Sequence, residues 1–373
     1  MNIKSIEIFG ISLPLLRPFV VSYDSYTRMP SIIVRIETDN GLAGYGEAVP
    51  DEHVTGETYG STLDVLRTHL APALLGENPF HLEKIHEKMN SRAYGVPSAK
   101  AALDIACHDL IGKLTGQPLY RLLGGPAHTE LKVPYVISIG VPSEMAEEAR
   151  QAVSQGYTEL KIKIGREVDE DVERVRAVRS AVGFGIRLRV DVNQGWRNVS
   201  TALKALRKLE DLDIDWIEQP ILADDIEGLA EIRRKTPIPV MIDEGLHGSK
   251  ELRQVIDRKA ADLINIKLMK CGGIYPAVKL IHQAEMAGIR AQIGSMVESA
   301  VATAAGAHLS LAKKNVISNE MVGPLMFSQD IGTLTYQGDK IMLTDAPGLG
   351  VAVDEQLLRE WGKDYARVGT PEA

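Results

Sequence analysis

Five charged residues recur at nearly regular intervals through the middle of the chain, each at the end of a short, largely apolar run. They are Lys163, Asp191, Glu218, Asp243 and Lys267, and the steps between them are 28, 27, 25 and 24 residues. Each step matches the length of one strand, a crossover helix and two short loops. In a (β/α)8 barrel the carboxyl ends of the parallel strands share one face, where the active site forms. The spacing therefore predicts an α/β fold with a (β/α)8-type barrel, a modified TIM barrel.

Three of these five residues are carboxylates, and three carboxylates in one closed pocket repel one another unless a cation compensates them. An all-oxygen ligand set suits a hard ion such as Mg²⁺, which keeps positions open for water or substrate. A lysine near a dication loses its proton more readily and can serve as a base. Any single residue is better explained as a structural salt bridge. The ordered set of five favours a metal-assisted acid–base site.

Short motifs surround the five positions. They are Lys161-x-Lys163, Asp191-x-Asn193, Glu218-Gln-Pro220, Asp243-Glu244, Asn265-Ile-Lys267 and Gly294-Ser-Met-x-Glu298. Together they resemble the enolase superfamily and its muconate-lactonising-enzyme subgroup, over nearly the whole chain. The resemblance implies Mg²⁺ on Asp191, Glu218 and Asp243, with Lys163 and Lys267 facing opposite sides of the substrate α-carbon. Residues 292–297 contain no histidine, so the histidine base of mandelate racemase is not expected.

Composition limits the class of partner. The chain has 373 residues, of which 42 are basic and 50 acidic, and the net charge of −8 argues against a nucleic-acid partner. No apolar run is long enough to span a bilayer, and the first residues lack a signal-peptide core. Cys107 and Cys271 form neither a disulfide framework nor a metal cluster, as expected in a reducing cytoplasm. We expect a cytoplasmic homo-oligomer with a small-molecule substrate and no membrane partner.

Residues 1–125 differ in pattern and predict an α+β capping domain. Strand patterns cover residues 3–11, 32–38 and 42–48, and Asn40-Gly41 favours a type I′ hairpin between the last two. Helical patterns follow over residues 60–74, 82–89 and 99–114. Turn formers at 122–126 mark the boundary with a barrel domain over 126–320. The remaining residues, 321–373, are expected to return to the capping domain.

Strands and helices are expected to alternate from residue 131 onward. The strands are predicted over residues 133–138, 160–164, 186–191, 214–218, 238–243 and 263–267. The helices are predicted over residues 144–155, 169–182, 199–209, 226–235, 249–257, 275–287 and 300–312. This alternation predicts a parallel sheet with right-handed crossovers.

Two segments of the capping domain are expected to close over the barrel mouth and to select the substrate. They are residues 19–26 and 49–56, which correspond to the specificity loops of the family. Asp51 and Glu52 are candidates for binding a cationic substrate tail, although a solvated turn explains them equally well. His53 and His247 are expected to be polar loop residues without a role in the chemistry.

The region after the predicted eighth strand separates close relatives. Dipeptide epimerases have Asp-x-Asp where this chain has Glu320-Met-Val322, and the two aspartates hold a free α-ammonium. Val322 stands in place of the second aspartate and so removes half of that interaction, which suits a substrate whose amine is acylated. Over its full length the chain is similar to N-succinylamino acid racemases, of the type that acts on N-succinyl-arginine and N-succinyl-lysine.

The reaction that this resemblance implies is a 1,1-proton transfer through an enediolate, with Mg²⁺ stabilising the negative charge. Lys163 and Lys267 are the two bases. Lys161 is expected to be a fixed cation beside the substrate carboxylate. The further candidate substrate contacts are Ser138, Ser295 and Glu298, each of which is equally well explained as a hydrogen bonder at a strand end.

Three other functions remain open from the sequence. A lyase or cycloisomerase, such as o-succinylbenzoate synthase or muconate cycloisomerase, uses the same enediolate. A dipeptide epimerase uses the same two lysines. A catalytically silent barrel with a binding or structural role lies outside the enzymes, and the intact lysines and carboxylates count against it.

Overall fold

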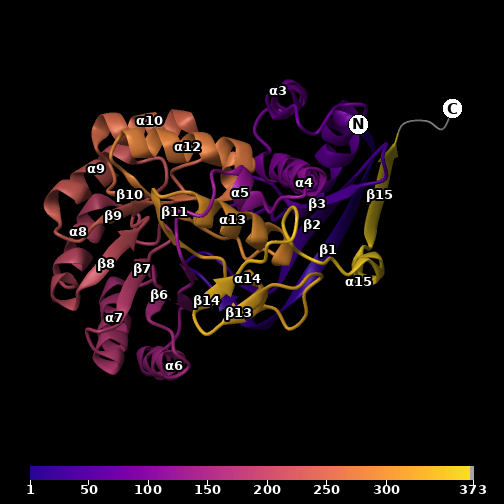
Figure 1. Cartoon of the computed structure of the whole chain (residues 1–373). Coiled ribbons are helices and arrows are strands. Elements are labelled where there is room, and N and C mark those ends of the chain that lie inside the picture. The colour runs from indigo at the N-terminus through magenta and orange to yellow at the C-terminus, as the bar shows by residue number, and fades with distance from the viewer. Residues whose placement is uncertain (370–373) are drawn as a thin grey trace.

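The computed structural model describes residues 1–369, which form a strand-rich N-terminal part beside a curled sheet surrounded by helices (Figure 1). Within this range no helix is long and apolar enough to cross a membrane. The predicted (β/α)8-type barrel with an α+β cap is confirmed by the eight parallel strands and the four-stranded antiparallel sheet described below.

The sheet of the capping domain has the strand order β15-β1-β2-β3. Its antiparallel strands are β1 (Ile3–Val20), β2 (Ser25–Thr38), β3 (Ala43–Ala48) and β15 (Asp364–Gly369). Ile6 and Ile8 pack into the core under the capping helices, whereas Phe9 and Ile11 pack into the core shared with the barrel. Successive strand residues point to opposite faces, so the sheet is buried on both sides and joins the two parts.

The capping helices are α1 (Tyr59–Val65), a π-helical turn (Leu66–Leu70), α2 (Ala71–Leu74), α3 (Leu82–Arg92), α4 (Pro97–Thr115) and α5 (Leu119–Leu122). The helix predicted over residues 60–74 is thus continuous but contains one wider turn. Helix α4 lies directly on β3, and a Cβ atom at Gly46 would lie 1.9 Å from the carbonyl oxygen of Ala102. Only glycine allows this close approach of helix to strand.

The eight barrel strands are parallel and follow one another in the order of the sequence. They are β5 (Tyr135–Ile137), β6 (Glu159–Lys163), β7 (Arg187–Asp191), β8 (Ile214–Glu218), β9 (Val240–Ile242), β10 (Leu263–Ile266), β11 (Arg290–Ile293) and β12 (Val316–Asn319). Among the described residues β5 and β12 share no strand pairing, but the side-chain amide of Asn319 donates to the carbonyl of Lys132, 2.8 Å away. That contact links the last strand to the chain just before the first.

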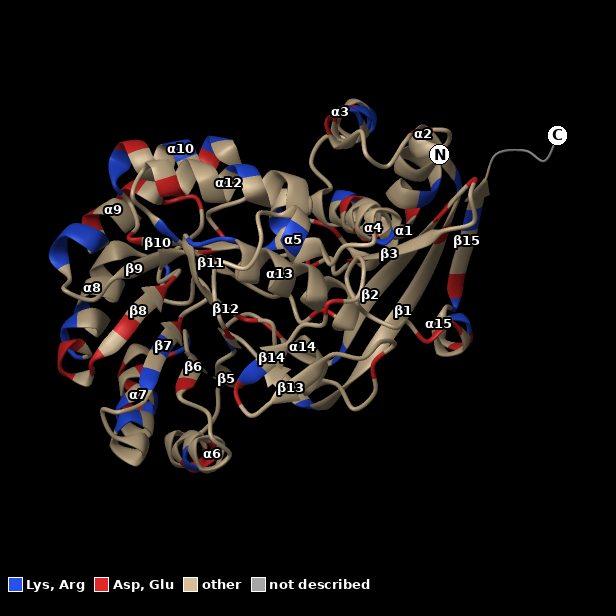
Figure 2. Ribbon diagram, viewed as in Figure 1, with Lys and Arg blue, Asp and Glu red and all other residues tan. Residues whose placement is uncertain are grey.

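Helices connect the barrel strands and cover their outer surface (Figure 1). They are α6 (Pro142–Ser154), α7 (Val168–Val182), α8 (Val199–Arg207), α9 (Ile226–Lys235), α10 (Ser249–Arg258), α12 (Ile274–Met286) and α13 (Ala300–Ala312), with a 3-10 turn (Glu210–Leu212) and short α11 (Leu268–Cys271). Figure 2 shows charged positions on α7, α8, α9 and α10, whereas α13 contains none and is almost wholly buried. Helix α13 therefore lies between the barrel and the cap.

The chain after β12 divides between the two parts of the molecule. Strand β13 (Thr335–Gln337) pairs with β14 (Lys340–Met342), which pairs in turn with β4 (Leu131–Lys132), and α14 (Gly323–Met326) precedes them. Helix α15 (Glu355–Trp361) and β15 then lie against β1. The domain limits 1–125, 126–320 and 321–373 stay a prediction.

Two local expectations for the capping domain differ from the structure. Strands β1 and β2 continue to Val20 and Ser25, so the segment 19–26 is the tip of a long hairpin and not an open loop. The Asn40-Gly41 turn is not type I′, because only Gly41 has a positive φ, of 84°, where type I′ needs two such residues. Side-chain bonds from Thr38 to Asn40 and the φ of Gly41 fix the turn instead.

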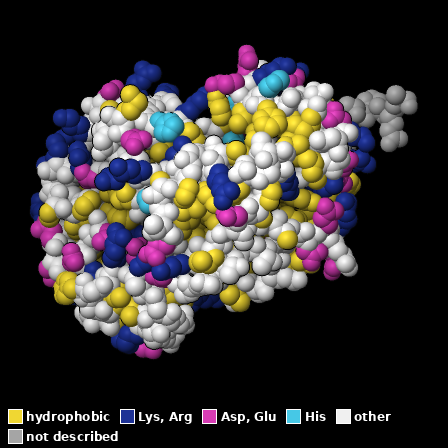
Figure 3. Space-filling view, viewed as in Figure 1, with side chains coloured by type: hydrophobic (Ala, Val, Ile, Leu, Met, Phe, Trp, Pro, Cys, Tyr) yellow, Lys and Arg dark blue, Asp and Glu magenta, His cyan; other side chains and the backbone are white. Residues whose placement is uncertain are grey.

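Charged side chains of both signs are interspersed over the visible face of the molecule (Figure 3). This mixed surface agrees with the small negative net charge of −8 and gives that face no extended basic patch. A basic face is the electrostatic feature that nucleic-acid binding requires.

Candidate active site

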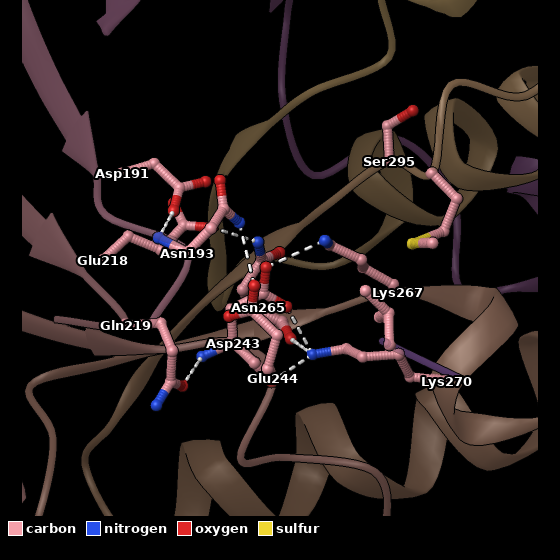
Figure 4. A network of polar contacts seen from close by, with 12 residues as sticks. Asp191, Asn193, Glu218, Gln219, Asp243, Glu244, Asn265, Lys267, Lys270 and Ser295 are labelled. Atoms are coloured by element: carbon pink, nitrogen blue, oxygen red, sulfur yellow. Dashed lines mark hydrogen bonds and ion pairs between the residues drawn. The ribbon is translucent and has the colours of Figure 1, made fainter. Parts of the chain in front are cut away.

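Three carboxylates converge at the carboxyl ends of neighbouring barrel strands (Figure 4). Asp191 ends β7, Glu218 ends β8 beside it, and Asp243 follows β9 directly. Each is buried and offers one oxygen, and the three oxygens lie within 4.8 Å of one another. A buried all-oxygen donor set of this size fits a hard dication such as Mg²⁺. The parallel register brings these residues together although they are far apart in sequence.

Two lysines from β6 lie on the Asp191 side of this cluster. The Nζ of Lys163 is 2.6 Å from Asp191 Oδ2 and 3.1 Å from Asn193 Oδ1. The Nζ of Lys161 contacts both Glu218 oxygens, at 3.0 and 2.9 Å, and also pairs with Glu320. Residues 161 and 163 point to the same face of β6 because side chains alternate along a strand.

Two further lysines lie on the Asp243 side. The Nζ of Lys267, directly after β10, is 2.8 Å from Asp243 Oδ2. Lys270, on α11, is buried and reaches Asp243 Oδ1 at 2.5 Å and the carbonyl of Asn265 at 3.2 Å (Figure 4). Lys270 was not predicted from the sequence as a site residue. Its spacing of three residues from Lys267, one helical turn, was the available signal.

The cluster is electrostatically coupled. Burial alone would raise the pKa of Asp191 and Asp243, but the neighbouring lysines hold both pKa values well below their usual range. Burial and the charge of Asp191 raise the pKa of Glu218 well above its usual value. Burial opposes the charge of Lys161 and Lys267, yet their carboxylate partners raise the pKa of both ammonium groups. The carboxylates and lysines therefore compensate one another within one buried network.

Side-chain amides fix the orientation of these carboxylates (Figure 4). Asn265 donates to Glu218 Oε1 at 2.8 Å, and Asn193 donates to Glu244 Oε1 at 2.8 Å. Gln219 accepts from the backbone N–H of Asp243 at 2.9 Å. Asn193 and Gln219 have positive φ values of 42° and 36°, a strained conformation that is common at functional sites. Asn193, Gln219, Glu244 and Asn265 belong to the motifs quoted above, but no role was predicted for them.

A small pocket of about 60 Å³ opens above this network. Its lining residues are Phe19, Val21, Tyr23, Tyr26, Met29, Asp51, Val136, Lys161, Lys163, Asn193, Lys267, Ser295, Met296, Val297, Glu320, Val322 and Met326. Both Lys163 and Lys267 line it, and so does the hairpin tip of the capping domain. The pocket therefore forms between the strand ends of the barrel and the cap.

The structure places the two acidic loop candidates differently. Asp51 is buried and lines the pocket, whereas Glu52 is exposed and lies outside the lining. The carboxylate of Asp51 accepts from the Tyr26 hydroxyl at 2.8 Å and from the backbone N–H of His53 at 2.8 Å and of Val54 at 3.1 Å. These bonds join the hairpin tip to the second loop and fix the acid at the pocket wall.

The histidines of this region support the loops. The His53 ring packs against Tyr23 with 4.7 Å between ring centroids, and His247 Nε2 lies 2.7 Å from the carbonyl of Val54. Neither histidine lines the pocket among the described residues. Both contacts hold the loop of residues 49–56 against its neighbours.

The remaining candidate contacts occupy three different positions. Ser295 lines the pocket, and its hydroxyl pairs with Glu298. Glu298 is buried behind Ser295 and is not part of the pocket lining. Its carboxylate accepts from the N–H of Met296 at 2.8 Å. Ser138 lines a neighbouring cavity, and its hydroxyl accepts from the N–H of Val20 at 3.4 Å. Of the three, only Ser295 reaches the pocket directly.

Glu320 and Val322, the two positions that separate close relatives, also line the pocket. The contact of Glu320 with Lys161 was not predicted from the sequence.

The chain matches two known protein families, each over part of its length, and is similar to several known proteins. Residues 5–124 match the mandelate racemase / muconate lactonizing enzyme N-terminal domain, and residues 144–357 match the enolase C-terminal domain-like family. An N-succinyl-L-Arg/Lys racemase from Bacillus cereus is 56% identical over 360 residues, which are 96% of this chain and 98% of that protein.

Solved structures of a racemase and an epimerase are also similar to this chain. The crystal structure of N-succinyl Arg/Lys racemase from Bacillus cereus has a TM-score of 0.98 and 55% identity, and the match covers 99% of this chain and 100% of that one. A dipeptide epimerase from Enterococcus faecalis, solved with Mg and the dipeptide L-Leu-L-Tyr, has a TM-score of 0.91 and 37% identity. That match covers 94% of this chain and 100% of the epimerase.

Proposed function

We infer the function of this chain from its family, since it belongs to the mandelate racemase / muconate lactonizing enzyme family of the enolase superfamily. The relatives described above are racemases and epimerases, which are isomerases. We propose that the chain is a Mg²⁺-dependent racemase of N-succinylated amino acids, with N-succinyl-arginine and N-succinyl-lysine as substrates. The reaction is a two-base 1,1-proton transfer at the α-carbon.

The observation that carries this proposal is the placement of Lys163 and Lys267 on two sides of one pocket. Lys163 belongs to the second barrel strand and Lys267 follows the sixth, half-way round an eight-stranded barrel. Lys163 pairs with Asp191 and Lys267 with Asp243, at the two flanks of the carboxylate cluster. Two lysines on opposite walls are what inversion at a carbon requires, because one, as its neutral amine, must remove a proton and the other, as its ammonium, must deliver one.

The carboxylate cluster fits Mg²⁺, with Asp191, Glu218 and Asp243 as its protein ligands. When bound there, the ion would neutralise the negative charge that develops on the substrate carboxylate as the α-proton leaves. Lys163 takes the proton from one enantiomer, and Lys267, as its ammonium, delivers one to the other face. The roles exchange in the reverse direction. Lys161 stays an ammonium, because its carboxylate partners raise its pKa, and it supplies a fixed positive charge.

The pocket walls support the choice of substrate. Asp51 is the acidic group at the cap side of the pocket, so it can attract the guanidinium or ammonium of a cationic side chain. Val322 gives the wall beside Glu320 an apolar surface, and the Glu320 carboxylate is paired with Lys161. Among the described residues, the only acid that a free α-ammonium would meet at this wall is Glu320, which is already paired with Lys161. An acylated nitrogen carries no charge and needs no acidic partner. Both features favour an N-acylated substrate with a basic side chain.

Dipeptide epimerase is the second candidate, because Glu320 lines the pocket and retains one of the two acidic positions of that class. The two functions differ in the charge of the group attached to the reacting residue. Dipeptides present an ammonium, and N-succinyl amino acids present a carboxylate. Direct comparison of these substrates decides between them.

The test is a screen in D2O with Mg²⁺ that follows α-proton exchange by NMR and inversion by optical rotation. The substrates are N-succinyl and N-acetyl derivatives of L-arginine, L-lysine and L-methionine, together with L-Ala-L-Arg and L-Leu-L-Tyr. We expect fastest exchange and racemisation with N-succinyl-arginine or N-succinyl-lysine. The double variant Lys163→Ala/Lys267→Ala serves as the control for contaminating activity. Faster turnover of a dipeptide than of every N-succinyl compound would reject the racemase proposal in favour of the epimerase.

A cytoplasmic location and a homo-oligomeric state stay predictions.

A further inference from the structure

We propose that the cavity next to the candidate active site is the subsite for the acyl group, and that Arg17 binds the distal carboxylate of that group. The inference rests on the proposed racemase function and extends it from the reacting carbon to the recognition of the acyl chain. None of the sequence motifs or relatives described above assigns a role to Arg17.

The second cavity is larger than the first and shares a wall with it. Its volume is about 330 Å³, against about 60 Å³ for the pocket with the lysines. Ligand pockets are typically on the order of 300–1,000 Å³, so the first pocket alone is small for a long N-acyl amino acid. The residues common to both are Phe19, Val136, Val322 and Met326. A substrate that reacts between the lysines can therefore extend past these apolar side chains into the second cavity.

Arg17 is the only charged residue among the described residues that line the second cavity. Its Nη2 donates to the Tyr135 hydroxyl at 2.7 Å and pairs with Glu148 Oε1 at 2.5 Å. Among residues 1–369, its Nε and Nη1 atoms have no hydrogen-bond partner. The guanidinium is thus held by one nitrogen, and the N–H groups of Nε and Nη1 are left for a ligand. A carboxylate can accept a charge-assisted hydrogen bond from either of these two nitrogens.

The rest of the lining fits a short chain with a polar end. Ser138, Gln155 and Tyr157 supply uncharged polar groups, and Pro134, Leu325 and Met326 supply apolar contacts. Tyr135 lies under the Arg17 guanidinium, 5.6 Å from its ring centroid, and packs edge-on against Tyr157. These contacts hold the arginine against the cavity without filling it. Methylene groups and a terminal carboxylate, the chemistry of a dicarboxylic acyl group, match this arrangement.

Charges at the two ends define the orientation of the substrate. Asp51 lines the first pocket and not the second, whereas Arg17 lines the second and not the first. The lysines between them are already paired with carboxylates of the buried cluster. A substrate with a cationic side chain and an anionic acyl group is attracted in one orientation and repelled in the other. Arg17 and Asp51 would then select together for N-succinylated basic amino acids.

The experiment compares Arg17→Gln with wild type on two substrates that differ only in charge. They are N-succinyl-L-arginine and its neutral amide isostere, N-succinamoyl-L-arginine, each assayed for kcat/KM by α-proton exchange. We expect Arg17→Gln to lower kcat/KM for the succinyl compound about ten- to a hundredfold, mainly through KM, because a charge-assisted bond is lost. The amide substrate should change by no more than about twofold.

Three further variants separate binding from support of the fold. Arg17→Lys keeps the charge without the planar guanidinium and should fall between wild type and Arg17→Gln. Glu148→Gln removes the partner of Arg17 but not its positive charge, and should retain the preference for the succinyl compound. Arg150→Gln is the matched control, since Arg150 is an exposed arginine of α6 that pairs with Glu147 at 2.7 Å. It should leave both substrates unchanged.

The outcomes distinguish the subsite from the racemase proposal. If wild type racemises N-succinyl-arginine but Arg17→Gln slows both substrates equally, or leaves their ratio unchanged, only the acyl subsite is rejected. If wild type exchanges the α-proton of no N-succinyl amino acid, the racemase proposal and the subsite are rejected together. A loss confined to the carboxylate substrate, with Glu148→Gln close to wild type, supports both.

Discussion

Lys163 and Lys267 belong to different strands and have different neighbours, although both line one pocket. Lys163 is held by Asp191 and Asn193, and Lys267 by Asp243. Each lysine is therefore fixed against its own wall, and in the proposed reaction it would reach only one face of a substrate between them. A variant that lacks one lysine should therefore lose racemisation but keep proton exchange on one enantiomer.

We predict that Lys163→Ala and Lys267→Ala each abolish racemisation, a loss of at least about a thousandfold for removal of a catalytic base. Each variant should still exchange the α-proton of the single enantiomer that its surviving lysine reaches. The measurement is deuterium incorporation into the separate L- and D-enantiomers by NMR. If either variant exchanges both enantiomers at the wild-type rate, the two-base mechanism is wrong.

Asp51 and Glu52 are adjacent in sequence but lie in different environments, and this gives a matched pair of variants. Asp51 is at the pocket wall and Glu52 is exposed. We predict that Asp51→Asn lowers kcat/KM for N-succinyl-arginine about ten- to a hundredfold relative to N-succinyl-methionine, because it removes the negative charge near the cationic side chain. The amide oxygen of asparagine can still accept from the N–H groups of His53 and Val54.

Glu52→Gln is the control and should change neither substrate. Equal slowing of both substrates by Asp51→Asn would mean that this acid supports loop closure only. A loss of selectivity in Glu52→Gln but not in Asp51→Asn would place the cation site on the exposed side of the loop.

The five residues that the regular spacing identified share one property, a fixed position at a strand end. Spacing along parallel strands reports such positions, so it predicted that Asp191, Glu218 and Asp243 would lie together. Spacing does not report contacts between elements. The Lys270–Asp243 pair and the Lys161–Glu320 pair join α11 and the end of β12 to distant strands, and only the folded chain brings them together. For the same reason the sequence could not separate Asp51 from Glu52.

At the scale of elements, buried carboxylates of the cap bind the N-termini of two barrel helices. Glu47, on β3, accepts from the N–H groups of Ser299 and Ala302 at the start of α13, at 2.9 and 3.0 Å. Asp104, on α4, accepts from the N–H groups at the start of α12, and His86 and His108 flank it. Acids satisfy the free N–H groups and the positive dipole end of a helix. These bonds connect the cap to the helices that follow Lys267 and Ser295.

The connection between β11 and α13 contains a buried acid with an unusual pKa. Burial, together with the nearby charge of Glu47, raises the pKa of Glu298 to about 7, although Ser295 and the N–H of Met296 bond to it. Between the ordinary pKa near 4.5 and pH 7, the folded state therefore binds more protons at this site than the unfolded state. The contribution of Glu298 to stability is fully present below pH 4.5 and is lost as the pH rises through 7.

We predict that the free energy of unfolding of wild type falls relative to that of Glu298→Gln between pH 5 and pH 7.5. The difference is at most about 3 kcal/mol, from about 1.4 kcal/mol per pKa unit. Urea unfolding of both proteins at the two pH values measures it. Glu298→Gln keeps the size of the side chain and can still accept from Met296. Parallel pH profiles for the two proteins would show that Glu298 does not titrate in this range.

The elements themselves were predictable where one pattern dominated. Helices α6, α7 and α9 end close to their predicted limits because their apolar spacing and terminal signals agree. Strand β1 extends nine residues beyond the predicted end at Ile11, to Val20, since its pairing with β2 continues past the alternating segment. Tertiary pairing decided that length, and a local pattern does not contain it.

At the scale of the whole molecule, the described residues gather nine charged side chains into one buried network. Five carboxylates take part, namely Asp191, Glu218, Asp243, Glu244 and Glu320, with Lys161, Lys163, Lys267 and Lys270. Acids outnumber lysines, so the network has room for an additional cation. Every member belongs to the barrel part, and the cap closes over it through the hairpin tip and the loop with Asp51.

We therefore predict that chelation of divalent ions by EDTA abolishes α-proton exchange and lowers the melting temperature reversibly. A ligand at a hundred times its dissociation constant stabilises the folded state by about 2.7 kcal/mol, which for a chain of this size corresponds to a shift of a few degrees. The lysine ammonium groups remain close to the carboxylates without the ion, so the chain should stay folded in EDTA. Thermal unfolding with EDTA, and again after Mg²⁺ is restored, measures the shift.

The variant Asp191→Asn separates a specific metal effect from a general effect of EDTA. Asparagine keeps a ligand oxygen but removes one negative charge from the cluster, so Mg²⁺ should bind much more weakly and EDTA should no longer change the melting temperature. Asp211→Asn, an exposed acid that pairs with Arg176, is the matched control and should respond to EDTA as wild type does. Full exchange activity of wild type in EDTA would contradict the metal assignment. An equal melting shift in Asp191→Asn would show that the ion responsible binds elsewhere, because only a site that includes Asp191 makes the shift depend on that carboxylate.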